Sequence, residues 1–174
     1  MKIKLICILF CFTLLSCGGL KTYIDYDETA EFNQYASFDF YTDLETGLDT
    51  LDQKRFTTAL TDALKEKGFK NQATPDFKIN YYSDFFENED QHNINIGMGT
   101  IGSHVGGNIS SGIPLRFNEY IISLTIEFVD AETDELYWQA VGEGKFAPDM
   151  PPEKRREFFE KLAEKAIKDY PPDH

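Results

Sequence analysis

Hydrophobic and polar residues alternate along much of this chain, as they do in strands that bury one face. The alternation is strongest in residues 120–129, where every second residue from Ile122 to Phe128 is a large apolar one. Further strands are predicted at residues 22–27, 36–41, 76–86 and 136–146, with a weaker one around residues 94–98. In residues 136–146 the alternation predicts that Leu136, Trp138 and Ala140 face the core together.

Two other segments carry apolar residues at helical spacing. The stripe from Phe56 to Leu64 predicts a helix that Thr50 or Asp52 caps and that Gly68 ends. A second helix is predicted to open at Pro151-Pro152 and to stop at Pro171-Pro172.

The order of these elements is strand, strand, helix, strand, strand, strand, strand, helix. It predicts an α+β two-layer sandwich, in which a largely antiparallel sheet of five to six strands carries two amphipathic helices on one face. Residues Gly97–Gly112 are rich in glycine and polar side chains, and we expect a long hairpin connection or a mobile flap there.

The N-terminus has the pattern of an export signal. Lys2 and Lys4 precede an almost wholly apolar run at residues 5–15, which is too short to span a bilayer as a helix. Leu14-Leu15-Ser16-Cys17 then looks like a bacterial lipobox. We therefore expect removal of residues 1–16, lipidation of Cys17 with a diacylglycerol and a fatty acid such as palmitate, a tether at 17–21, and one domain at 22–174.

Cysteine content and charge exclude several classes of function from the mature chain. Cys7 and Cys11 leave with the signal, so no disulfide, thiolate metal site or cysteine nucleophile is expected. The whole chain has a net charge of −13, and the mature chain, without Lys2 and Lys4, has fifteen basic and thirty acidic residues. This charge disfavours binding to nucleic acid and to anionic lipid headgroups.

Several short motifs, in a fixed order, resemble one family. They are Ile24-Asp25-Tyr26-Asp27 with the segment Phe32–Phe38, Lys67-Gly68-Phe69 with Pro75-Asp76-Phe77, Asp130–Trp138, and Tyr170-Pro171-Pro172. The family is domain of unknown function 4136, common among lipoproteins of Bacteroidota and other Gram-negative bacteria. The resemblance implies a lipid-anchored envelope domain without an assigned activity, and it brings no catalytic residues.

Asp25 and Asp27 are the carboxylates most suggestive of chemistry. On one strand face they would lie about 7 Å apart, which is compatible with the acid pair of a glycoside hydrolase. Edge-strand solubility or a hydrogen bond that braces a loop is the alternative interpretation. His92 and His104 could bind zinc with an acidic residue, or be exposed histidines without a role. Trp138 is expected in the core, since stacking on a sugar or peptide would require an exposed ring.

Two glycine- or acid-rich motifs fit no cofactor. Residues Gly97–Gly102 match GxGxxG, but no helix is predicted after them to face a pyrophosphate. Asp130, Glu132 and Asp134 resemble the start of a calcium loop that lacks its glycine and its final glutamate, so a solvated turn is the better interpretation. No cofactor and no metal are expected.

These features favour a non-catalytic binding or scaffold module that holds an envelope protein through an exposed sheet face or through Gly97–Gly112. The alternatives are an envelope enzyme that uses acidic residues, and a carrier of a small ligand or lipid. An exposed aromatic patch would favour the first, a polar pocket the second and an apolar cavity the third. No acidic run follows Cys17, so we expect the periplasmic face of the outer membrane.

Overall fold

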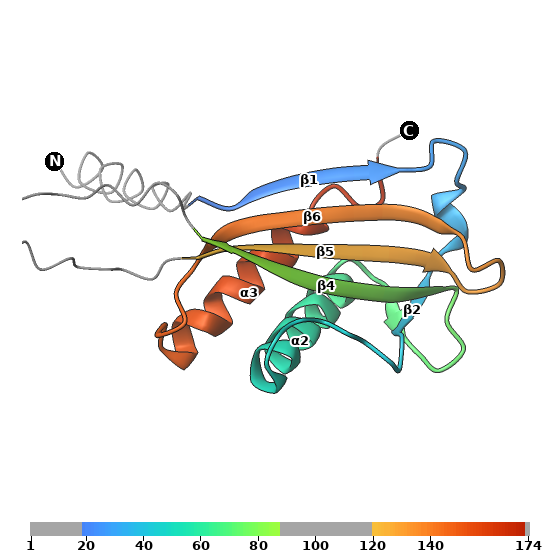
Figure 1. Cartoon of the computed structure of the whole chain (residues 1–174). Coiled ribbons are helices and arrows are strands. Elements are labelled where there is room, and N and C mark those ends of the chain that lie inside the picture. The colour runs from blue at the N-terminus through green and yellow to red at the C-terminus, as the bar shows by residue number, and fades with distance from the viewer. Residues whose placement is uncertain (1–18, 88–119, 173–174) are drawn as a thin grey trace, which may run out of the picture.

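The computed structural model describes residues 19–87 and 120–172 (Figure 1). They form one mixed sheet with two helices packed on the same face, which confirms the predicted α+β sandwich. The helices are α2 (Thr50–Glu66) and α3 (Pro152–Ala166). The strands are β1 (Lys21–Tyr26), β2 (Ser37–Phe40), β3 (Lys70–Asn71), β4 (Phe77–Glu87), β5 (Tyr120–Asp130) and β6 (Leu136–Phe146).

The strands lie in the order β1-β6-β5-β4-β2-β3. Neighbours from β1 to β4 are antiparallel, whereas β2 is parallel to both β4 and β3. Parallel neighbours need a crossover connection, and α2 provides the one between β2 and β4. The predicted strand around residues 94–98 lies outside the described residues.

Aromatic rings fill the layer between the sheet and the helices. Trp138 of β6 stacks on Phe128 of β5 with ring centroids 4.4 Å apart, and both side chains are fully buried. Tyr170, which follows α3, contacts both rings edge-on. Burial of these apolar rings is the main source of stability for the fold.

A β-bulge in β6 corrects one sequence prediction. The register between β5 and β6 shifts at Phe128/Val129, so that Tyr137 has no residue directly opposite. Tyr137 therefore joins Trp138 in the core, where it is 4% exposed, while Leu136 is turned out and is 50% exposed. The prediction that Leu136 faces the core was wrong because simple alternation does not allow for an extra residue.

The ends of α2 confirm one predicted cap and correct the other. Asp49, and neither Thr50 nor Asp52, is the N-cap, since its carboxylate accepts the backbone N–H groups of Leu51 and Asp52, both at 2.9 Å. Gly68 has a φ of +95°, the conformation that ends many helices, as predicted. With Asp49 as the cap, the side chain of Asp52 is left for another contact.

Candidate binding surface

The face of the sheet opposite the helices is here called the outer face. Phe77, Ile79 and Tyr81 of β4 are buried under the helices, so the residues between them point the other way. The registers extend this division across four strands. The outer face includes Lys21, Tyr23, Asp25, Lys78, Asn80, Tyr82, Asp84, Phe86, Ile121, Ser123, Thr125, Glu127, Val129, Gln139, Val141, Glu143 and Lys145.

An aromatic and apolar row crosses the outer face. Tyr23 of β1 lies opposite Val141 of β6, which lies opposite Thr125 of β5, which lies opposite Tyr82 of β4. Tyr23 is 55% exposed and Tyr82 is 36% exposed, while Thr125 between them is buried. Phe86, nearer the end of β4, is 55% exposed. The outer face thus presents large rings to solvent.

A polar row lies beside the aromatic one. Asp25, Gln139, Glu127 and Asn80 are opposite one another across the same four strands. The side-chain amides of Asn80 and Gln139 donate to the two carboxylate oxygens of Glu127 at 2.9 and 3.2 Å. Glu127 is thereby fixed in orientation, and a fixed acceptor beside exposed rings is suited to recognition.

The two predicted aspartates accept hydrogen bonds from residues close to them in the chain. Asp25 accepts the N–H of Tyr26 at 3.0 Å, and Asp27, just beyond β1, accepts the hydroxyl of Thr29 at 2.7 Å and its N–H at 2.8 Å. These bonds, the hydroxyl bond above all, lower the pKa of Asp27. A catalytic acid requires a raised pKa, so at neutral pH Asp27 offers only a carboxylate.

The other sequence-predicted residues are placed as follows. Trp138 is fully buried, so its ring is not available for stacking on a ligand. His92, His104, Cys17 and the segment Gly97–Gly112 all lie outside the described residues.

Asp130 is used by the turn that joins β5 to β6. One carboxylate oxygen accepts the N–H groups of Glu132 and Thr133 at 2.8 and 2.9 Å, and the other accepts the hydroxyl of Tyr35 at 3.0 Å. Burial and this hydrogen bond raise the pKa of Tyr35 to about 12. In the part of the chain that the structure describes, no group of three His, Cys, Asp or Glu side chains is arranged to hold a metal ion.

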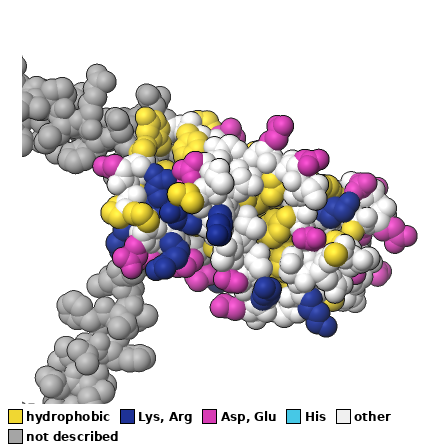
Figure 2. Space-filling view, turned by 90° about the horizontal axis from the view of Figure 1, so that it is seen from below, with side chains coloured by type: hydrophobic (Ala, Val, Ile, Leu, Met, Phe, Trp, Pro, Cys, Tyr) yellow, Lys and Arg dark blue, Asp and Glu magenta, His cyan; other side chains and the backbone are white. Residues whose placement is uncertain are grey.

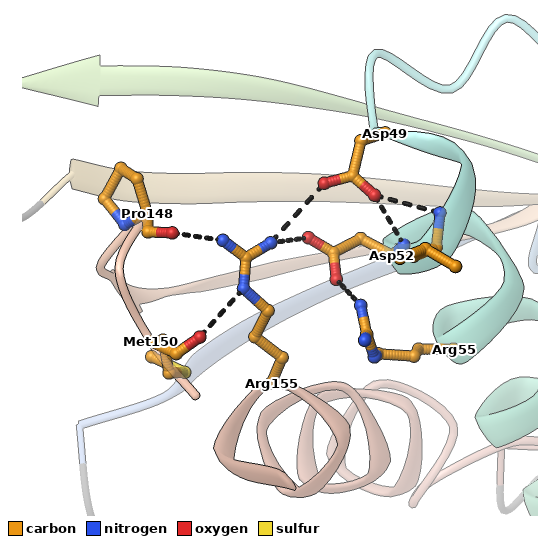
Figure 3. A network of polar contacts seen from close by, with 7 residues as sticks. Asp49, Asp52, Arg55, Pro148, Met150 and Arg155 are labelled. Carbon is orange, nitrogen blue, oxygen red and sulfur yellow. Dashed lines mark hydrogen bonds and ion pairs between the residues drawn. The ribbon is translucent and has the colours of Figure 1, made fainter. Parts of the chain in front are cut away.

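Arg155 is the centre of a network of polar contacts that the sequence did not indicate (Figure 3). Its guanidinium donates to Asp52 of α2 and, at 3.4 Å, to Asp49, the N-cap of α2. It also donates to the carbonyl oxygens of Pro148 and Met150, and it lies over the ring of Phe146 at 5.1 Å. The side chain of Asp52 is only 4% exposed. Because both acids are paired with a cation, this cluster is a structural clamp between α2 and α3.

The helix-bearing side of the molecule has a different character (Figure 2). Basic and acidic side chains are interspersed there. A shallow groove of about 460 Å³ runs between α2 and α3, lined by Leu51, Ala59 and charged residues of both signs such as Arg156 and Glu160. Within the described residues, no helix is both long and apolar enough to cross a bilayer.

Asp76 gives a prediction on pH dependence. Its carboxylate accepts the N–H groups of Ala36 and Ser37, both at 2.9 Å, and the hydroxyl of Ser37 at 2.7 Å, and these bonds lower its pKa. The native state therefore binds fewer protons than the unfolded chain, and the stabilisation is lost as the pH falls below the unfolded aspartate pKa of about 3.9.

We expect Asp76→Asn to flatten the acid-side loss of stability, measured by urea unfolding at a series of pH values from neutral to about pH 3. Asp84→Asn, at an exposed carboxylate of β4, is the matched control. Equal pH profiles for Asp76→Asn and the unsubstituted chain would contradict the assignment.

The described residues define an α+β sandwich domain in which no described helix covers the outer face of the sheet. Residues 22–172 match the family described as domain of unknown function DUF4136, and the chain belongs to that family. No curated protein matches the sequence.

Solved structures that share the fold include the following two. A PDZ domain protein from Parabacteroides distasonis superposes with a TM-score of 0.51 at 16% identity, over 95% of this chain and 40% of that one. This chain thus spans two fifths of that protein. The PelC dodecamer from Paraburkholderia phytofirmans gives a TM-score of 0.50 at 8% identity, over 86% of this chain and 95% of that one. At such identities the likeness shows the fold alone.

Proposed function

We propose that this protein is a membrane-anchored lipoprotein of the cell envelope, and that its domain is a non-catalytic binding or scaffold module. Cys17 carries the lipid anchor, and the domain faces the periplasm from the outer membrane. The partner is an envelope protein, which the outer face binds. The single observation that carries the binding role is that Tyr23 and Tyr82 expose their rings at the two ends of one cross-strand row, on a face that no described helix covers.

The composition of the outer face supports a protein partner. Aromatic residues are enriched in the centres of protein–protein interfaces, where they contribute much of the binding energy. Tyr23, Tyr82 and Phe86 supply such rings, and Glu127 supplies an acceptor already held in place by two amides. The PelC chain, which shares the fold, forms a dodecamer and is an example of this fold serving in assembly.

The described residues give less support to the alternatives. The buried acid Asp52 is paired with Arg55 and Arg155, which suits structure better than acid–base catalysis. A carrier needs an apolar cavity, but aromatic rings fill the layer beneath the helices. Neither an enzyme nor a carrier is therefore favoured.

The position of β1 supports a short tether. β1 begins at Lys21, four residues after Cys17, and four extended residues span at most about 14 Å. A domain anchored at Cys17 would therefore stay close to the membrane surface, where a partner in the same membrane is within reach.

The test is site-specific photo-cross-linking in the native envelope. A photoreactive residue at position 82 is expected to capture one discrete protein, identified by mass spectrometry, whereas one at Thr58, in the groove between the helices, is the control. Capture from position 58 and none from 82 would overturn the assignment of the outer face. Intact-mass analysis decides the anchor separately, since an N-terminus other than a diacylglyceryl Cys17 would refute it.

A further inference from the structure

β1 leaves one edge of the sheet open (Figure 1). Among the described residues it is the last strand in the sheet order, and the strand it pairs with there is β6. The opposite edge is β3, which has two residues. An unpaired edge of six residues is a template for another strand, unless its side chains oppose pairing.

The register shows which backbone groups of β1 are open. Asp27 donates its N–H to the carbonyl oxygen of Tyr137 at 3.0 Å, so the odd-numbered residues of β1 face β6. The backbone groups of Thr22, Ile24 and Tyr26 therefore face away from the sheet. The N–H of Tyr26 is already taken by the carboxylate of Asp25 at 3.0 Å. Within residues 19–87 and 120–172, Thr22 and Ile24 are thus left with a donor and an acceptor each.

We propose that a second copy of this chain pairs with β1 across a two-fold axis, antiparallel, with Tyr23 opposite Tyr23. In this register Thr22 of each copy lies opposite Ile24 of the other, and all four open donors and acceptors of each copy are used. Lys21 of each copy then lies opposite Asp25 of the other on the outer face. Opposite charges directly across two strands stabilise the pairing, so this edge complements its own copy.

The neighbouring register is disfavoured by the same residues. Ile24 opposite Ile24 would require the N–H of Tyr26, which Asp25 occupies, and would place Tyr23 opposite Asp25. A shift by a single residue would turn every side chain to the wrong face of the sheet. Of these three registers, only the one with Tyr23 opposite Tyr23 satisfies backbone, charge and face together.

The pairing joins two sheets into one and places both outer faces on the same side. A contact made by a short strand buries less area than a stable dimer needs, so the association is weak in dilute solution. Anchoring in one membrane would raise the effective concentration of the copies. Only this last step rests on the proposed function, because the register itself does not depend on the anchor.

The test is a cysteine at the two-fold axis in the full chain, produced in a bacterial envelope. Directly opposed residues at this position have Cα atoms about 4.5 Å apart, within the range that a disulfide spans. Tyr23→Cys is expected to give a disulfide-linked dimer on a non-reducing gel. Tyr82→Cys is the matched control, as another exposed tyrosine of the outer face on an interior strand. The unsubstituted chain controls for Cys7, Cys11 and Cys17.

A charge exchange tests the pairing independently. In the Tyr23→Cys chain, Lys21→Asp places an aspartate at position 21 of each copy opposite Asp25 of the other. This repulsion is expected to lower the dimer yield about tenfold. Adding Asp25→Lys restores opposite charges and is expected to restore the yield. Equal yields from positions 23 and 82, or no recovery in the double exchange, would overturn the proposal. With Cys17→Ser the yield should fall while position 23 stays preferred over 82, which separates failure of the anchor from failure of the register.

Discussion

Arg155→Ala is expected to lower the free energy of unfolding by about 3 kcal/mol, at the low end of the cost of breaking a buried ion pair. Arg155 joins three parts of the chain: the first turn of α2, through Asp49 and Asp52, the segment before α3, through the carbonyl oxygens of Pro148 and Met150, and the ring of Phe146. Its loss removes all of these contacts at once.

Most of the expected loss in free energy of unfolding comes from Asp52. Its side chain is 4% exposed and, among the described residues, would keep Arg55 as its cation, whose guanidinium lies 2.5 Å away. A buried charge that loses one of two partners is costly because little water reaches it. Arg55 remains, which is why the expected loss is at the low end. Asp49 depends less on Arg155, since it also accepts hydrogen bonds from the backbone N–H groups of Leu51 and Asp52. The bond from Asp52 is the main cause of the lowered pKa of Asp49.

Urea unfolding followed by far-ultraviolet circular dichroism measures the effect. Arg156→Ala is the matched control, because Arg156 is the next residue of α3, is 60% exposed, and its ion pairs with Glu153 and Glu160 lie on the surface. Such pairs contribute about 0–1 kcal/mol. If Arg155→Ala cost no more than Arg156→Ala, the clamp would have no role in stability.

The elements that could be predicted from the sequence are those with local causes. Alternation placed β4, β5 and β6, and the apolar stripe placed α2, because residue spacing alone decides which face is buried. Gly68 was identified for the same reason, because a glycine directly after a helical stripe marks the C-terminal end of the helix. The outer-face residues follow from the same alternation, since a strand that buries Phe77 and Ile79 must expose Lys78 and Asn80.

What could not be predicted depends on contacts between distant segments. The row from Tyr23 to Tyr82 exists only because β1 pairs with β6, and strand order is not visible in a local pattern. Arg155 and Asp52 are 103 residues apart in the chain. The bulge that turns Tyr137 inward adds one residue to β6 without a glycine or proline at that position to mark it.

Trp138→Ala is expected to cost about 4 kcal/mol, the largest effect of any single substitution considered, since truncation of a buried tryptophan leaves a large cavity. The ring is fully buried, stacked on Phe128 at 4.4 Å and packed edge-on against Tyr170 at 5.1 Å. A domain of this size has a total stability of about 5–15 kcal/mol, so the variant would unfold at a much lower urea concentration.

Trp138→Phe separates packing from hydrogen bonding. The indole Nε1–H of Trp138 has no acceptor among the described residues, so phenylalanine removes no hydrogen bond and leaves a smaller cavity. We expect it to cost less than half as much as alanine. Trp138 is the only tryptophan, so circular dichroism rather than fluorescence must follow unfolding in both variants. If both variants lost the same free energy of unfolding, Trp138 would contribute shape-specific stacking on Phe128 rather than filled volume. If alanine lost less than about 1 kcal/mol, the ring would lie outside the core.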